Sequence, residues 1–220
     1  MNIIENIPAD RIEPRARIAL NGVLFVFGRI REEYERLIYL LISSRRQDLG
    51  DQIIACAWNI VDWAEKLRKL LGYGAGIKKR DNWFKELEKA IAPAEEIRHS
   101  LQHIDKHMEE CFKASLPSVG FLISYVMGEN GQGYDIMVSI PSGSKCDGTD
   151  KLSAYIKVNI AFTPPVIAAT LFIADKQINV TEMVSAAILG EKAFIDYINE
   201  TYMKVQQPAA AYGVNAAAEP

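Results

Sequence analysis

The chain of 220 residues has little cysteine and little histidine, with three of each. The cysteines, Cys56, Cys111 and Cys146, are far apart and odd in number, which argues against a disulfide framework and fits a reducing compartment. No long apolar run is present either, since "GVLFVFGRI" is about half of the roughly 20 residues that a membrane-spanning helix needs. The first ten residues lack a basic region followed by an apolar run, so we expect no signal peptide. These absences predict a cytoplasmic protein without a membrane partner.

Neither sign of charge dominates the whole chain, whose net charge is −3 at pH 7, but the two signs are unevenly distributed. Residues 11–89 hold 16 Lys and Arg against 11 Asp and Glu, whereas residues 90–220 hold 9 against 15. A basic first half could favour a polyanion such as RNA. The excess is modest for a nucleic-acid binder, so solvated Lys and Arg on long helices are the simpler explanation.

The first half of the chain has a helical pattern, from about residue 15 to residue 113. "RIREEYERLIYLLISSRR" and "DQIIACAWNIVDWAEKLRKLLGYGAG" repeat apolar residues at helical spacing, and Asp51 and Gly72 are placed to cap the second of these helices. "NWFKELEKAIA" predicts a short third helix, and Pro93 suits the first turn of a fourth. The segment "GVLFVFG" is ambiguous, because a short strand has the same pattern.

After residue 116 the apolar runs become β-rich. "VGFLISYVMG" and "GYDIMVSIP", joined by "ENGQG", predict a hairpin, "KLSAYIKVNIAF" alternates like a half-buried strand, and "VIAATLFIA" predicts a further strand. "VTEMVSAAILGEKAFIDYINETYMK" predicts a last helix with Thr181 as its N-cap.

The predicted fold class is therefore α+β. We expect an N-terminal antiparallel bundle of about four helices, followed by a small antiparallel β-sheet and a C-terminal helix. In domain terms this is a helical bundle at 15–116, an α+β extension with a β-meander and the terminal helix at 117–205, and a disordered tail at 206–220.

All three histidines lie in "IRHSLQHIDKHMEE", residues 97–110, at a spacing of four. On a continuous helix the apolar residues of this stretch form one core stripe, made of Ile97, Leu101, Ile104, Met108 and Cys111. The histidines, His99, His103 and His107, then point away from the core. Two histidines four residues apart can share a metal ion, with Glu95 as an oxygen donor, but no histidine elsewhere completes the ligand set. We expect neither a metal nor another cofactor.

Within this stretch "RHSLQH" consists of an arginine, a polar residue, three further residues and a histidine. It resembles the R-polar-x-x-x-H motif of the HEPN superfamily, and its place on a late helix after two long helices is similar as well. The resemblance covers about residues 15–113. It implies metal-independent RNA cleavage or RNA binding by a homodimer, in a bacterial defence or toxin–antitoxin role with a cognate antitoxin or other partner protein.

The same resemblance assigns roles to three residues. Arg98 would hold the scissile phosphate, which its planar guanidinium suits, and His99 would fill the polar position of the motif. His103 would serve as general acid or base on the ribose 2′-hydroxyl, leaving a cyclic phosphate.

Two observations bear on this assignment. Residues five apart on a regular helix point about 140° away from each other, so Arg98 and His103 need a second copy of the chain to converge on one phosphate. Asp62 and Glu65, on the tryptophan-rich helix, are candidate supporting acids. The sequence leaves open a non-catalytic interaction or ligand-binding protein in which the polar helix face serves solubility alone.

Overall fold

The computed structural model describes residues 3–43, 49–73, 81–103, 105–106, 108–109, 117–127, 134–142, 166–173 and 176–203. Two short 3-10 helices, Ile3–Asn6 and Ala9–Arg11, come first. The helices of the bundle follow: α1 (Pro14–Ser43), α2 (Gly50–Tyr73), α3 (Asn82–Ile91) and α4 (Pro93–Gln102). The strands are β1 (Phe121–Met127), β2 (Tyr134–Ser139), β3 (Val166–Ile173) and β4 (Lys176–Asn179). The last helix, α7 (Val180–Ile198), ends in a π-helical turn at Asn199–Met203. The predicted α+β fold class is confirmed.

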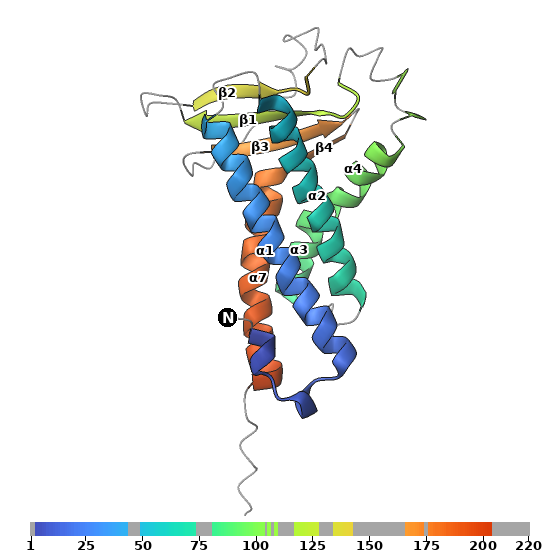
Figure 1. Ribbon diagram of the computed structural model, residues 1–220, viewed down its shortest axis with the longest axis vertical. Helices are drawn as coiled ribbons and strands as arrows, with labels where there is room; N and C mark the ends of the chain where they lie inside the picture. The colour runs from blue at the N-terminus through green and yellow to red at the C-terminus, as the bar shows by residue number, and fades with distance from the viewer. Residues whose placement is uncertain are drawn as a thin grey trace, which may run out of the picture.

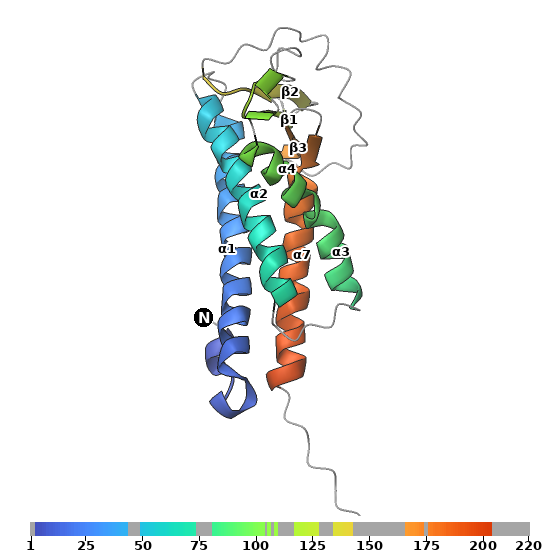
Figure 2. The same cartoon turned by 90° about the vertical axis from the view of Figure 1, so that its right-hand side faces the viewer.

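Helices α1 and α2 form a long antiparallel pair, with α7 beside them and the sheet across one end (Figure 1). The segment "GVLFVFG" belongs to α1, because Val23, Val26 and Phe27 continue the buried stripe that runs on to Ile30 and Leu37 at helical spacing. Turning the molecule by 90° shows α3 on the far side of α7 from α1, and α4 close to the sheet end of the bundle (Figure 2). Among the described helices, none has the length and apolar composition that crossing a membrane requires.

Both residues predicted to cap α2 lie inside it instead. Asp51 is in the first turn, and its Oδ1 accepts a hydrogen bond from the Ser142 N–H at 2.7 Å, which fastens the start of α2 to the chain just after β2. Gly72 is exposed and helical, and α2 continues to Tyr73. The Asp51 carboxylate accepts its hydrogen bond from a backbone N–H outside its own helix. The spacing of apolar residues does not show where such a donor lies.

The four described strands form one antiparallel sheet in the order β2-β1-β3-β4. Strands β1 and β2 are the predicted hairpin pair, with Tyr125 opposite Ile136, and β3 is the strand predicted from "VIAATLFIA". Strand β4 was not predicted, because it has only four residues and Ile178 is its single buried side chain. The connector "ENGQG", the predicted strand "KLSAYIKVNIAF" and the predicted tail lie outside the described residues.

Helix α7 begins directly after β4, and its N-cap is Asn179 rather than Thr181. The Asn179 side chain accepts a hydrogen bond from the Glu182 N–H at 3.0 Å. Thr181 serves a different purpose, because its hydroxyl accepts hydrogen bonds from the Ala169 N–H and the Tyr34 hydroxyl at 3.0 and 3.4 Å. It thereby joins α7 to β3 and to α1.

One hydrophobic core extends through the helices and one face of the sheet. Leu122 and Leu171 on the sheet belong to the same buried cluster as Leu37 of α1, Ile60 of α2 and Phe194 of α7. The other face of the sheet has a smaller cluster in which the Phe121 and Phe172 rings stack with centroids 4.9 Å apart. The domain boundary at residues 116 and 117 stays a prediction, since residues on both sides contribute to the main core.

Candidate functional site

Helix α4 places the three residues of the motif at the end of a short helix. Pro93 occupies its first turn as predicted, followed by the acidic residues Glu95 and Glu96, which the positive end of the helix dipole favours. The helix ends at Gln102, and His103 has φ −114° and ψ 35°, outside the helical range. Arg98 and His99 are therefore in α4, and His103 is its C-cap.

The continuous helix predicted through residues 97–110 is therefore wrong. Ile97 is buried and Leu101 packs against the core, but Met108, predicted as a member of the same stripe, is 57% exposed. Residues 105–106 and 108–109 are helical but lie beyond the break at His103. Among the described residues Met108 is not a member of the core, so core packing does not carry α4 on to this position. Ile104, His107 and Cys111 lie outside the residues whose side chains are described.

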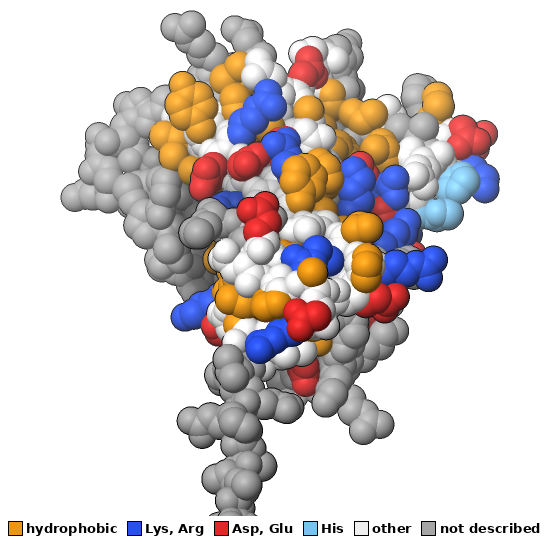
Figure 3. Space-filling view, turned by 60° about the horizontal axis from the view of Figure 1, so that its bottom comes forward, with side chains coloured by type: hydrophobic (Ala, Val, Ile, Leu, Met, Phe, Trp, Pro, Cys, Tyr) orange, Lys and Arg blue, Asp and Glu red, His pale blue; other side chains and the backbone are white. Residues whose placement is uncertain are grey.

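The histidines of the motif contact each other. The His99 and His103 rings lie edge to face with centroids 4.3 Å apart, His99 exposed and His103 half-buried. The outward position predicted for His99 is thus confirmed. On the molecular surface the described histidines lie beside Lys and Arg side chains (Figure 3).

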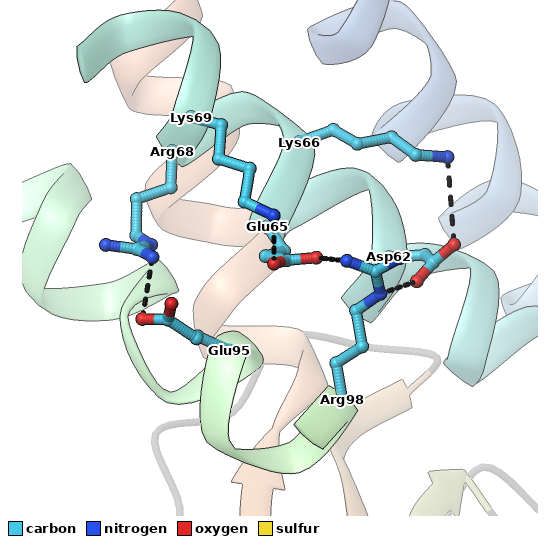
Figure 4. Close-up of polar contacts among 7 residues, drawn as sticks. All are labelled: Asp62, Glu65, Lys66, Arg68, Lys69, Glu95 and Arg98. Carbon is cyan, nitrogen blue, oxygen red and sulfur yellow. Dashed lines mark hydrogen bonds and ion pairs between the residues drawn. The ribbon is translucent and has the colours of Figure 1, made fainter. Parts of the chain in front are cut away.

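Arg98 points toward α2 (Figure 4). Its Nε donates to the Asp62 Oδ1 at 2.8 Å, and its Nη1 donates to the Glu65 Oε2. In the described part of the chain no hydrogen bond joins Arg98 to either histidine. The sequence-based expectation of supporting acids therefore has a structural counterpart, since both candidate acids contact the arginine.

Glu65 is the buried member of these ion pairs, with its side chain 6% exposed. Lys69 donates to its other oxygen at 2.7 Å, so the carboxylate is shared between two cations (Figure 4). Burial alone would raise the pKa of Glu65, but the hydrogen bonds from Lys69 and Arg98 outweigh burial and hold this pKa below its ordinary value. Glu65 is thus held as a carboxylate that keeps Arg98 in place.

Two further ion pairs complete what we call the Arg98 network. Lys66 approaches Asp62 at 3.7 Å, and Arg68 of α2 pairs with Glu95 of α4 at 2.6 Å. The network consists of four cations and three carboxylates: Asp62, Glu65, Lys66, Arg68, Lys69, Glu95 and Arg98. It links α2 to α4.

An aromatic pair adjoins the Arg98 network. The Lys66 ammonium lies 4.0 Å from the centroid of the Trp63 ring, and Phe25 meets that ring edge to face at 5.9 Å. Phe25 is 60% exposed although it lies in the middle of α1. We call Phe25, Trp63 and Lys66 the aromatic face, which Asp62 connects to Arg98.

Metal-ligand geometry is not found among the described residues. They include no group of three or more His, Cys, Asp and Glu side chains placed to share an ion. Glu95, the oxygen donor considered for a histidine site, is paired with Arg68.

Part of this site was readable in the sequence. Asp62 with Lys66, and Glu65 with Lys69, are spaced i to i+4 on one helix, which is the spacing of helical ion pairs. The contacts of Arg98 with the two acids join separate helices, and no spacing rule signals them. Comparisons with protein-family models, with curated proteins and with solved structures find no match for this chain.

Proposed function

We propose that the chain is a HEPN-like protein that binds and cleaves RNA without a metal, in a bacterial defence or toxin–antitoxin role. The observations that support this proposal are the fixed position of Arg98 and the contact between the two histidines of the motif. Arg98 is fixed by acids on α2, and His99, the next residue of α4, contacts His103 at the C-cap of the helix.

Arg98 retains hydrogen-bonding capacity for a phosphate. A guanidinium has five N–H donors, and the two carboxylates occupy one on Nε and one on Nη1. The Arg98 side chain is 28% exposed, so part of it remains accessible to a ligand. An arginine already held by a buried acid loses little freedom when an anion arrives, which favours phosphate binding.

The histidines are suited to the proton transfers of RNA cleavage. One imidazole would take the proton of the ribose 2′-hydroxyl, whose oxygen then attacks the adjacent phosphorus and displaces the 5′-oxygen of the next nucleotide. A second imidazole in its acid form would protonate that leaving oxygen, giving a 2′,3′-cyclic phosphate and a free 5′-hydroxyl. His103 is proposed for this chemistry, and His99, which touches its ring, supports it.

A homodimer belongs to the proposal, because Arg98 contacts α2 and no described contact joins it to the histidine pair within one copy. The aromatic face supports self-association, since it includes the exposed Phe25. Phe25 contacts Trp63, and Trp63 contacts Lys66 of the Arg98 network. The cations and acids on this surface already pair with one another. Two copies of the surface can therefore meet without either copy leaving a charge unpaired.

The test is RNA cleavage in the presence of EDTA. Wild-type protein should cleave an RNA pool to products ending in a 2′,3′-cyclic phosphate. Arg98→Ala and His103→Ala should each lower the rate by about 100-fold or more. Lys106→Ala, an exposed cation just beyond the motif, is the control and should retain the rate. No cleavage by the wild type, or equal cleavage by the variants, would support the non-catalytic binding protein instead.

A further inference from the structure

A groove lies between α3 and α7. Its volume is about 950 Å³, within the range typical of small-molecule sites. The walls come from α3, from the start of α4 and from the first half of α7, and β3 and β4 close one end. Its described lining residues include no member of the Arg98 network, of the aromatic face or of the histidine pair, so the groove is a separate site.

The walls of the groove are fixed relative to each other. Gly190 of α7 faces Leu87 of α3 so closely that a Cβ on Gly190 would lie 2.8 Å from the Leu87 Cδ2. At the sheet end, the Asn179 side chain caps the first turn of α7. The space between these two points is therefore set by the packing of the bundle and is present before a ligand arrives.

The floor of the groove is apolar and aromatic. Phe172, Met183 and Leu87 are buried, and the half-buried Trp83 is held by edge contacts with other aromatic rings. Leu189 lies on the α7 wall and is 71% exposed. An apolar or aromatic ligand body would cover these side chains and remove their surface from water.

Charge on the two walls selects the polar part of the ligand. Glu86 of α3 and Glu182 of α7 are both exposed, and neither forms an ion pair within the described part of the chain. Lys89 is the single cation among the described lining residues, one turn from Glu86 on the same helix. Two carboxylates from opposite walls, above an aromatic floor, match an amine attached to an apolar group.

We propose that this groove binds a small organic cation with an aromatic or aliphatic body. The apolar part lies against Trp83, Phe172 and Met183, and the ammonium lies between Glu86 and Glu182. Ligand binding in this groove does not depend on RNA cleavage, so its test is separate from the test of the proposed function.

The test uses full-length protein and two probes that share one ring system. Binding of 2-naphthylmethylamine, a cation, and of 2-naphthylacetate, an anion, is measured by isothermal titration calorimetry. The amine should bind in the millimolar range or tighter, and the acetate at least about tenfold more weakly. The double variant with Glu86→Gln and Glu182→Gln should weaken the amine about tenfold and leave the thermal midpoint unchanged.

The matched control is Glu88→Gln, which removes an exposed carboxylate from α3 outside the groove lining and should leave amine binding unchanged. The proposal is overturned by no amine binding at millimolar concentration, by equal binding of the two probes, or by an equal loss in the control. Leu189→Ser should weaken the amine as well, because an exposed residue is replaced without disturbing the core.

Discussion

A single buried carboxylate determines the geometry of the motif. Glu65 accepts hydrogen bonds from Lys69 of its own helix and from Arg98 of α4, so its charge is needed on both sides. A buried carboxylate without such partners would be costly, so loss of either cation should weaken the contact between the helices. Arg98 consequently points to α2 and not along its own helix toward His103.

Replacing Glu65 should destabilise the fold. Glu65→Gln keeps the shape but removes the charge, and we expect the free energy of unfolding at pH 7 to fall by about 1–3 kcal/mol in urea titrations. The control is Glu95→Gln, whose side chain is 55% exposed in its pair with Arg68, and its effect should stay below about 1 kcal/mol.

The pH dependence of the same variant gives a second readout. Because the folded pKa of Glu65 lies below its unfolded value, its contribution is present at neutral pH and is lost as the pH falls from about 4.3 through the folded pKa. The gap between wild type and Glu65→Gln should therefore narrow on acidification. A gap that stays constant down to acid pH would contradict the assignment of a lowered pKa.

At the scale of elements, helical spacing predicted the helices correctly where a core lies under the apolar stripe. The buried residues of α1, α2 and α3 follow it, and "GVLFVFG" joined α1 because its apolar residues continue that stripe. The prediction failed after Gln102, where the stripe continues in sequence but Met108 is exposed. Strand β4 was missed because four residues with one buried side chain leave no readable alternation.

A substitution at Gly72 tests whether α2 ends there, as predicted, or continues, as the structure has it. In the structure Gly72 is helical and exposed, and a Cβ there would meet nothing within 4 Å. Gly72→Ala should therefore raise the free energy of unfolding by about 0.5–1 kcal/mol, because alanine loses less backbone entropy in a helix. Destabilisation in chemical denaturation would instead indicate a left-handed helix cap at this position.

Thr181 connects three elements through one hydroxyl. Thr181→Val preserves the shape and leaves the buried Ala169 N–H without its acceptor, so we expect a loss of about 1–3 kcal/mol in the free energy of unfolding. Ser185→Ala is the control, since that exposed hydroxyl only donates back to the Thr181 carbonyl of its own helix. Equal effects of the two variants would show that the junction adds no stability.

At the scale of the whole molecule, the arrangement of the helices relative to each other could not be predicted from the sequence. Helix α7 returns from the sheet to pack beside α1, α2 and α3, and the contact of the Arg31 Nη2 with both carboxylate oxygens of Glu191 joins residues far apart in the chain. The contact between Arg98 and Glu65 is of the same kind. Spacing predicts which residues share a face of one helix, whereas such contacts depend on how whole helices pack.

The proposed function also depends on the whole assembly. Within one copy Arg98 contacts α2 while His99 and His103 contact each other at the end of α4, so no described contact joins the two parts of the proposed site. A second copy would supply His103 to the Arg98 of the first. The central claim is therefore that an active unit combines Arg98 of one chain with His103 of another.

Mixing two inactive variants tests this claim most directly. Arg98→Ala and His103→Ala proteins are purified separately, allowed to exchange subunits, and assayed for RNA cleavage in EDTA. If each site combines residues of two chains, half of the dimers are mixed and each has one intact site, so about a quarter of the wild-type rate should return. A mixture as inactive as either variant alone, under conditions where the wild type cleaves, would contradict the account.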